Sequence, residues 1–334
     1  MKQAMTVRMM RWWMVGMLAL AGPALAQTRE QPIGLDTPGG QVAGTLALPA
    51  ATAAAAPVPV VLILAGSGPT DRDGNSAMLP GHNDSLKMLT AALADAGFAS
   101  VRYDKRGIAA SRAAAPDESA LRFDTYVDDA VAWIGKLQAD PRFTRVTVLG
   151  HSEGALVGLL AARRGAAAAY VSVAGVAQAP GMVLRRQLAG KLPPELAAAN
   201  ERILSALEHG QTVAEVPPAL AALYRPSVQP YLISWMRYDP AKELAALGIP
   251  VLIVQGTTDI QVGVDQAELL KAARPDAVLA IIPGMNHVLK EVPADPARQQ
   301  ASYGDPALPL APGLAAGIVG FLRGLPGVQA QIQR

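Results

Sequence analysis

The sequence has 334 residues and a net charge of +2, with half of its residues hydrophobic and 17% charged. That length suits one large α/β domain with an insertion, or two small domains. It contains no run of lysines and arginines, which argues against a nucleic-acid partner. It also has no cysteine, which excludes disulfides, thiolate metal sites, a cysteine nucleophile and a lipidated N-terminal cysteine.

The first 26 residues have the three parts of a secretory signal peptide. Positive residues lie between Lys2 and Arg11, an apolar run follows over residues 12–21, and an A-x-A cleavage motif ends at Ala26. The apolar run is too short for a membrane span, which needs about 20 residues. We therefore expect cleavage before Gln27, no stable membrane anchor afterwards, and a protein that is periplasmic or secreted.

Strand and helix patterns alternate along the rest of the chain. Strands are expected where apolar residues alternate or run continuously, over residues 42–48, 58–64, 99–103, 146–149, 170–173, 251–254 and 277–282. Helices are expected over residues 85–96, after an N-cap at Asp124, through Arg163 and over residues 313–322. This alternation predicts a mostly parallel central sheet with helices on both faces.

Residues 177–247 interrupt that alternation. They contain no convincing buried strand but several helical patterns, over residues 182–188, 194–207, 218–224 and 229–235. An all-helical insertion between two core strands is typical of a cap or lid. We therefore predict a core of residues 27–176 and 248–334, with a helical lid over residues 177–247.

The five residues Gly150-His151-Ser152-Glu153-Gly154 lie directly after a predicted strand and directly before a predicted helix. A G-x-S-x-G sequence in that position forms a strained turn, in which neither glycine position has room for a Cβ. The turn lifts the serine Oγ clear of the sheet. Ser152 is therefore the candidate nucleophile, and the alternative is an ordinary glycine-flanked turn.

A serine nucleophile needs a base, and the base needs an orienting carboxylate. Of the four histidines, only His287 follows the last predicted strand on a short loop at the carboxyl edge of the sheet. Asp259 is the first acid after the strand at residues 251–254, whereas the loop after residue 173 has none before Glu195. The chain order Ser152, Asp259, His287 is that of α/β-hydrolases.

An oxyanion hole needs two N–H donors, one from the residue after the nucleophile and one from a loop after an early strand. Glu153 supplies the first. The loop Gly66-Ser67-Gly68 follows the strand at residues 58–64, and we expect the Ser67 N–H to be the second donor, with its two glycine neighbours as alternatives. A phosphate-binding loop is less favoured, because Pro69 follows and the Lys-Ser/Thr pair is missing.

The chain resembles the α/β-hydrolase superfamily from about residue 42 to residue 325. More narrowly, it resembles bacterial carboxylesterases related to serine aminopeptidase-like hydrolases, in the motifs LILAGSGPTDRDGN, RYDKRG, GHSEG, QGTTD and MNH. The resemblance implies hydrolysis of short-acyl esters through an acyl-enzyme. It also implies that residues 71–73 shape the rim of the oxyanion loop and that residues 104–107 support the floor of the site. We expect Arg72 and Arg106 to make structural salt bridges rather than substrate contacts. Ala65 departs from the pattern, since many relatives have histidine there.

The sequence leaves three functions open. The first is a carboxylesterase, and the second is another enzyme with the same triad, either a peptidase, an acyltransferase or a thioesterase. The third is a non-catalytic binding protein, against which an intact triad argues. Fold and triad do not separate the enzymatic alternatives. A peptidase that takes free N-termini would need acidic lid residues, but the lid glutamates have the pattern of ordinary solvated helix charges. We expect a small acyl ester as the ligand and no cofactor or metal, and the sequence does not predict the oligomeric state.

Two aromatic residues of the predicted lid, Tyr231 and Trp235, lie one helical turn apart and share a face. They are candidates for walls of an acyl pocket. The alternative, that they pack the lid onto the core, is equally compatible with the sequence.

Overall fold

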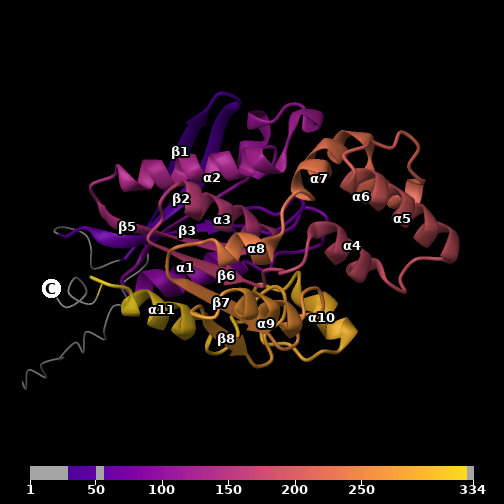
Figure 1. The fold of residues 1–334 in the computed structure, drawn as a ribbon. Coiled ribbons are helices and arrows are strands. Elements are labelled where there is room, and N and C mark those ends of the chain that lie inside the picture. The colour runs from indigo at the N-terminus through magenta and orange to yellow at the C-terminus, as the bar shows by residue number, and fades with distance from the viewer. Residues whose placement is uncertain (1–28, 50–55, 329–334) are drawn as a thin grey trace, which may run out of the picture.

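The computed structural model describes residues 29–49 and 56–328, so the predicted signal peptide lies outside the described residues. Eight strands form one sheet in the order β1-β2-β4-β3-β5-β6-β7-β8 (Figure 1). The strands are β1 (Arg29–Thr37), β2 (Gly40–Leu48), β3 (Val58–Leu64), β4 (Ala99–Tyr103), β5 (Phe143–His151), β6 (Ala169–Val173), β7 (Val251–Gly256) and β8 (Val278–Ile282).

The six strands from β4 to β8 pair in parallel, whereas β2 runs antiparallel to both β1 and β4. The mostly parallel sheet predicted from the sequence is therefore confirmed. Because parallel strands end at the same edge, the loops after β3, β5, β7 and β8 all leave the carboxyl edge of the sheet. These are the loops that carry the predicted site residues.

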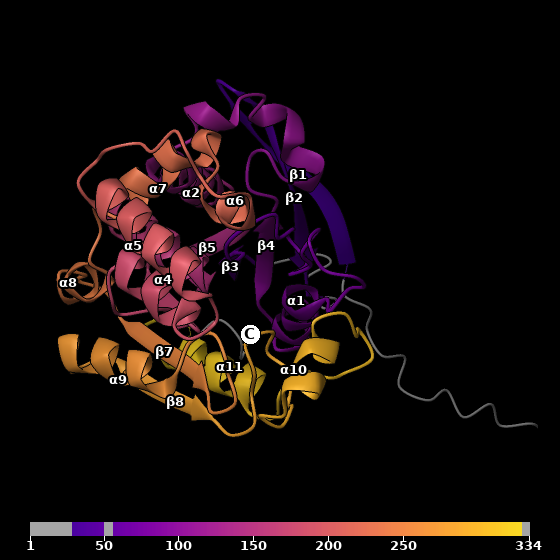
Figure 2. The same ribbon diagram turned by 90° about the vertical axis from the view of Figure 1, so that its right-hand side faces the viewer.

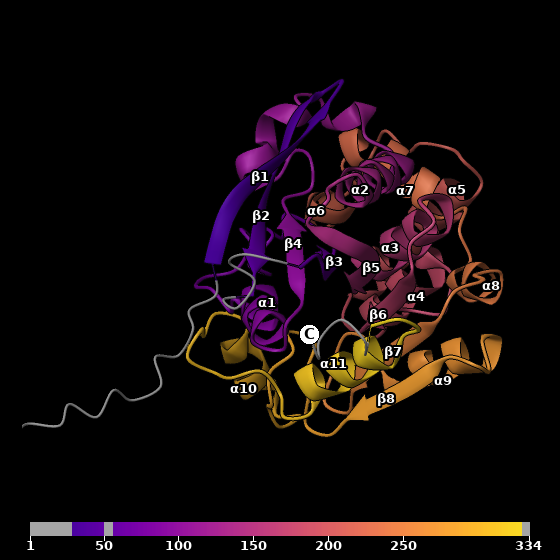
Figure 3. The same ribbon diagram turned by 90° about the vertical axis from the view of Figure 1, so that its left-hand side faces the viewer.

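Helices cover both faces of this sheet, and Figure 3 shows α1 and α11 on one side of the sheet and α2, α3, α8 and α9 on the other. The helices are α1 (Ser85–Asp95), α2 (Phe123–Gln138), α3 (Glu153–Arg164), α4 (Pro180–Leu188), α5 (Pro194–Glu208), α6 (Ala221–Tyr224), α7 (Gln229–Trp235), α8 (Pro240–Ala245), α9 (Val264–Ala273), α10 (Pro296–Ser302) and α11 (Leu314–Gly324). Short 3₁₀ turns span Ala109–Ala114, Glu118–Ala120, Pro218–Leu220 and Pro226–Val228.

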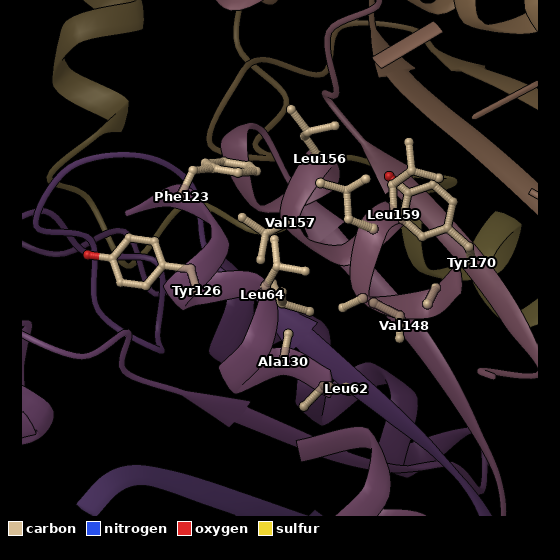
Figure 4. Close-up of a cluster of buried hydrophobic side chains, with 14 of the residues drawn as sticks. Leu62, Leu64, Phe123, Tyr126, Ala130, Val148, Leu156, Val157, Leu159 and Tyr170 are labelled. Atoms are coloured by element: carbon tan, nitrogen blue, oxygen red, sulfur yellow. The ribbon is translucent and has the colours of Figure 1, made fainter. Parts of the chain in front are cut away.

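The core consists of two apolar layers, and β3 contributes to both. Leu62 and Leu64 face the layer under α2 and α3, while Val61 and Ile63 face the layer under α1 and α11. Figure 4 shows the first layer, where side chains of α2 and α3 meet those of β3, β5 and β6. Burial on both faces explains why β3 is a continuous apolar run rather than an alternating one.

Helices α4 to α8 all lie between β6 and β7 in the chain, as expected for the helical insertion. The segment from α4 to α7 projects beyond the end of the sheet in Figure 1 and lies in front of it in Figure 2. Helix α8 instead lies on the core, where Glu243 pairs with Arg163 of α3. None of the helices in the described ranges is long and apolar enough to cross a membrane.

Helix α2 begins differently from the prediction. Asp124 was expected as its N-cap, but the helix starts at Phe123, and the Thr125 hydroxyl accepts from the Arg122 N–H at 3.2 Å. Asp124 instead accepts a hydrogen bond from the Tyr238 hydroxyl. The cap prediction was wrong because the helix begins one residue earlier, with Arg122 as the N-cap residue, and the Asp124 carboxylate is bound by a tertiary partner.

Candidate active site

Ser152 lies between the last residue of β5 and the first residue of α3. Its backbone has φ +55° and ψ −122°, a conformation that costs a residue with a side chain about 1–3 kcal/mol. Two hydrogen bonds hold it there, from the Ser152 N–H to Val173 O and from the Ala155 N–H to Ser152 O, both 2.9 Å. The strained strand–turn–helix geometry expected from the G-x-S-x-G sequence is therefore present.

Both glycines of the turn are required by close backbone contacts. A Cβ on Gly150 would lie 2.1 Å from the Gly154 carbonyl oxygen, and a Cβ on Gly154 would lie 2.5 Å from that of Ala65. Neither contact could be relieved by a side-chain movement, since both partners are backbone atoms. The glycines let α3 begin directly against the end of β3.

The predicted base and acid lie against each other although they are 28 residues apart. His287 Nδ1 is 2.8 Å from Asp259 Oδ2, and the Asp259 side chain is 1% exposed. Asp259 Oδ1 also accepts from the N–H groups of Gln261 and Val262, at 2.8 and 2.9 Å. Burial acts to raise the pKa of Asp259, but His287 and these donors outweigh it and lower that pKa below its usual value.

Because a carboxylate accepts from Nδ1–H, the other nitrogen of His287, Nε2, is free to accept a proton. The loop that carries His287 is fixed at its base by the Thr258 N–H, which donates to Met285 O at 3.1 Å. It is also fixed by the Asn286 N–H, which donates to Lys290 O at 2.9 Å. The ends of β7 and β8 thus hold the histidine and its acid in register.

His151, next to the nucleophile, is a structural residue. Its Nε2 donates to the His287 carbonyl oxygen at 2.8 Å, and the two rings lie 4.9 Å apart. Burial, followed by the proximity of His287, lowers the pKa of His151 to about 3. The ring is therefore neutral, and it ties the serine turn to the loop of the base. The other two histidines, His82 and His209, are exposed.

The loop after β3 passes directly over the nucleophile. A Cβ on Gly66 would lie 3.2 Å from Ser152 Cβ, and the Thr70 hydroxyl donates to Ser67 O at 2.8 Å, which holds the turn. Within residues 29–49 and 56–328, no backbone or side-chain acceptor receives the Ser67 N–H. Glu153 is the first residue of α3, where an N–H has no partner inside the helix. Both predicted oxyanion donors are thus available beside Ser152.

Arg72 and Arg106 make the salt bridges expected of them. Arg72 Nη2 is 2.7 Å from Asp104 Oδ2, and its backbone N–H donates to the same carboxylate at 2.8 Å. Arg106 pairs with Asp129 of α2 through Nε and Nη2, and its Nη1 donates to the Ala114 carbonyl oxygen at 3.4 Å. The rim of the oxyanion loop is thereby tied to the loop after β4.

Sequence reasoning did not single out Lys105, although it lies within the RYDKRG motif. This lysine is 5% exposed, and its Nζ donates to the Gly66 carbonyl oxygen and lies 3.4 Å from Glu153 Oε1. A buried lysine is rare and needs partners. The resemblance implied only that residues 104–107 as a group support the floor of the site, without a role for this side chain.

Tyr231 and Trp235 both belong to an aromatic cluster between α2 and α7. Trp235 stacks on Phe123 with ring centres 6.1 Å apart, and Tyr231 meets Tyr126 at 5.5 Å and 60°. Tyr238 completes the cluster against Phe123. Packing of the insertion onto the core, which the sequence left open, is therefore one role of both residues. The pocket role remains a prediction.

In the part of the chain that the structure describes, no group of three or more His, Asp or Glu side chains is placed to hold a metal ion. The acids beside the nucleophile are all engaged, Asp259 with His287 and Glu153 with Lys105. This arrangement offers a serine on a strained turn, a buried His–Asp pair and two free N–H donors. Those are the components of acyl transfer through a serine.

Solved structures of esterases share the fold. Est1E of Butyrivibrio proteoclasticus with bound ferulic acid matches with a TM-score of 0.59 and 17% identity, over 90% of this chain and all of that one. The esterase domain of a Rhodothermus marinus protein matches with a TM-score of 0.51 and 17% identity, over 82% of this chain and 94% of that one.

Sequence comparison gives a nearer relative and a family. Esterase EstD of Thermotoga maritima is 30% identical over 237 residues, which are 70% of this chain and 55% of EstD, so the chain spans about half the length of that relative. The family model described as serine aminopeptidase, S33, matches residues 79–291, which include Ser152, Asp259 and His287. Because that match covers well over half of the chain, the protein belongs to the serine aminopeptidase S33 family of α/β-hydrolases.

Proposed function

We propose that this protein is a serine esterase that hydrolyses esters of small carboxylic acids through an acyl-enzyme. The observation that carries the proposal is the buried 2.8 Å pair of His287 and Asp259 at the same sheet edge as the strained Ser152. Ser152 is the nucleophile, His287 the base and Asp259 the residue that fixes the tautomer of the base. The Ser67 and Glu153 N–H groups form the oxyanion hole.

In the acylation step, Ser152 Oγ attacks the ester carbonyl carbon while its proton passes to His287 Nε2. The carbonyl oxygen becomes an oxyanion that accepts from the Ser67 and Glu153 N–H groups. The imidazolium of His287 is stabilised by the Asp259 carboxylate. The tetrahedral intermediate collapses, the bond to the alkoxy oxygen breaks, and His287 gives its proton to the leaving alcohol.

Deacylation repeats these steps with water. His287 Nε2 takes a proton from the water as it attacks the acyl carbon, and the oxyanion forms again in the same hole. The second tetrahedral intermediate then releases the carboxylic acid and returns the proton to Ser152 Oγ. Every proton transfer runs through one nitrogen, which is consistent with the fixed Nδ1–H to Asp259.

Esterase activity is better supported than aminopeptidase activity, because a free peptide amine needs an unpaired acid near the nucleophile. Two of the four acids in the segment from α4 to α7, Glu201 and Glu208, are paired with Arg185 at 2.9 and 2.6 Å. Arg185 also holds the pKa of Glu201 below its usual value through these hydrogen bonds. The other two, Glu195 and Glu215, are exposed.

The segment α4–α7 supports the further proposal that it acts as a lid over the acyl site. It begins where β6 ends at the carboxyl edge, and its α7 packs on the start of α2, close to the Ser152 turn. Tyr231 lies near the Glu153 carboxylate, whose charge adds to burial in raising the pKa of Tyr231. The aromatic cluster therefore reaches the residue directly after the nucleophile.

We also propose that the protein is exported, on the strength of the positive, apolar and A-x-A segments of its first 26 residues. Expression of the full chain with cell fractionation, followed by N-terminal sequencing, tests this. Export predicts a mature chain beginning at Gln27 in the periplasmic or extracellular fraction. A full-length chain retained in the cytoplasm would disprove it.

A substrate panel tests the esterase proposal directly. The purified protein is assayed with p-nitrophenyl esters of graded acyl length, with aminoacyl p-nitroanilides, and with methyl ferulate because the similar fold Est1E binds ferulic acid. The proposal expects the highest kcat/KM on short p-nitrophenyl esters. Nitroanilide hydrolysis that exceeds ester hydrolysis would assign a peptidase instead.

A further inference from the structure

Lys105 contacts both segments that carry the proposed oxyanion donors, at Gly66 and at Glu153. It follows β4 on the loop that the Arg72–Asp104 salt bridge holds. Its Nζ donates to the carbonyl oxygen of Gly66, which lies 39 residues earlier in the chain. The same Nζ is 3.4 Å from the carboxylate of Glu153, which lies 48 residues later. The ring of Tyr126 covers it, with Nζ 5.5 Å from the ring centre. The contacts are therefore shielded from water.

The Gly66 carbonyl and the Ser67 N–H belong to the same peptide unit. In a trans peptide these two groups point in opposite directions, so a donor that holds the carbonyl also fixes the direction of the N–H. The Ser67 N–H has no acceptor of its own in the described part of the chain. Without Lys105, this exposed turn would have only the Thr70 hydroxyl bond to Ser67 O to orient it.

The contact with Glu153 acts on the second donor. The Glu153 carboxylate lies 3.4 Å from Nζ, and Glu153 is the residue directly after Ser152 and the first of α3, so this contact holds the residue that carries the second donor. The charge on Lys105 also draws electron density from the Gly66 carbonyl, which makes the Ser67 N–H a stronger donor. In a site of low dielectric this polarisation is large.

We propose that Lys105 is a positioning residue that aligns both oxyanion donors, through the Gly66 carbonyl and the Glu153 carboxylate. It does not touch the substrate and is not a base. The inference rests on the proposed serine esterase function. It predicts that removing Lys105 weakens binding of the transition state but not of the substrate.

The test compares Lys105→Met with wild type and with Lys136→Met, which removes an exposed lysine of α2. The best p-nitrophenyl ester gives kcat and KM. A trifluoromethyl ketone, whose hemiketal adduct with Ser152 Oγ places an oxyanion in the hole, is compared with the matching methyl ketone. We expect Lys105→Met to lower kcat about 10- to 100-fold with KM changed less than about twofold, somewhat less than the loss of a whole donor. Trifluoromethyl ketone affinity should fall in proportion.

Lys105→Met leaves the Glu153 carboxylate buried without its partner, which could destabilise the fold. A second variant therefore separates a folding defect from a loss of positioning. The double variant Lys105→Met, Glu153→Gln removes that charge and keeps both backbone donors. It should show the same loss of kcat and of trifluoromethyl ketone affinity. Lys105→Arg keeps the charge and should recover part of the kcat.

The outcomes separate the two proposals. If wild type hydrolyses no ester and takes no fluorophosphonate at Ser152, the serine esterase function itself fails. If wild type is active but both Lys105→Met variants keep kcat within twofold, the positioning role fails alone. A fall in kcat without a matching fall in trifluoromethyl ketone affinity would also overturn it, because the loss would then lie outside the oxyanion hole.

Discussion

The carboxyl edge of the sheet and the helical insertion above it are built in different ways. At the edge, Ser152 and Asp259 follow the buried strands β5 and β7, and His287 follows the outer strand β8. The Thr257 and Thr258 N–H groups donate across to Ile282 O and Met285 O, both at 3.1 Å, and the Ser152 N–H donates to Val173 O at 2.9 Å. The geometry of the catalytic groups is therefore set by the most rigid part of the molecule.

The insertion is held mainly by side chains. The aromatic cluster joins α7 to α2, while the Arg185 pairs join α4 to α5 on the surface, where such pairs contribute little stability. Met182 and Leu223 in the insertion expose 51% and 38% of their surface. From this difference we expect the proposed reaction type to depend on the sheet edge and substrate choice to depend on the insertion.

The largest expected effect is at the edge. Ser152→Ala should lower esterase kcat by about 10⁶-fold, the scale of losing a serine nucleophile, with the fold intact because only Oγ is removed. Fluorophosphonate labelling followed by mass spectrometry measures it, and Ser119→Ala, an exposed serine, is the control. Labelling that persists in Ser152→Ala at another serine, such as Ser67, would move the nucleophile elsewhere.

The next effect tests whether His287 and Asp259 act together. His287→Ala should cost nearly as much as loss of the nucleophile, and Asp259→Asn on the order of 10⁴-fold, because the amide no longer fixes the reactive tautomer. The double variant should be no worse than His287→Ala alone. Steady-state kcat/KM for all three variants gives the comparison, and additive losses would show that the two residues serve separate steps.

Some secondary-structure elements could be predicted from the sequence and others could not. The strand at residues 58–64 and the helix at residues 229–235 were predicted with their observed bounds, because long apolar runs and helical spacing are strong local signals. Strand β1 was missed, since it is an edge strand with one proline, and all of its residues except Leu35 are exposed or half-buried. Helix α9 was missed as well, because its apolar face is weak.

The candidate site also has parts that could be predicted from the sequence and parts that could not. The order of Ser152, Asp259 and His287 along the chain, each after a strand, was visible because parallel topology brings strand ends together. The two contacts of Lys105 could not be predicted from the sequence, because they join residues 39 and 48 positions away and depend on the conformation of the side chain. The packing of Trp235 could not be assigned either, since sharing a helical face does not reveal what that face covers.

Two tryptophans, one in the core and one in the insertion, provide a matched pair for stability. Trp133 of α2 is fully buried and stacks on Tyr103 at 5.5 Å, so Trp133→Ala should lower the free energy of unfolding by about 3–5 kcal/mol. Trp235 is half-buried against Phe123, and Trp235→Ala should cost less, about 1–2 kcal/mol.

Urea unfolding and the acyl-length profile are measured for both tryptophan variants. If the insertion forms the acyl pocket, Trp235→Ala shifts the preference toward longer p-nitrophenyl esters, whereas Trp133→Ala leaves the profile unchanged. An unchanged profile in Trp235→Ala, together with a stability loss as large as that of Trp133→Ala, would reduce Trp235 to a core residue and end the pocket assignment.

The smallest effect concerns His151, the neutral histidine that ties the Ser152 turn to the His287 loop. Its pKa in the folded protein is about 3, against about 6.5 in an unfolded chain, so the unfolded state binds more protons between these values. Stability is therefore full above pH 6.5 and is lost as the pH falls toward 3, by about 2 kcal/mol between pH 7 and pH 5. His151→Gln, which keeps a donor for the His287 carbonyl but does not titrate, should remove that part of the pH dependence.

Urea unfolding at pH 7 and at pH 5 measures this pH dependence. The control is His209→Gln, which replaces an exposed histidine of the insertion. Identical pH slopes in wild type and His151→Gln would mean that the ring gains a proton without unfolding the turn, and that the sheet edge is less rigid than its backbone bonds indicate.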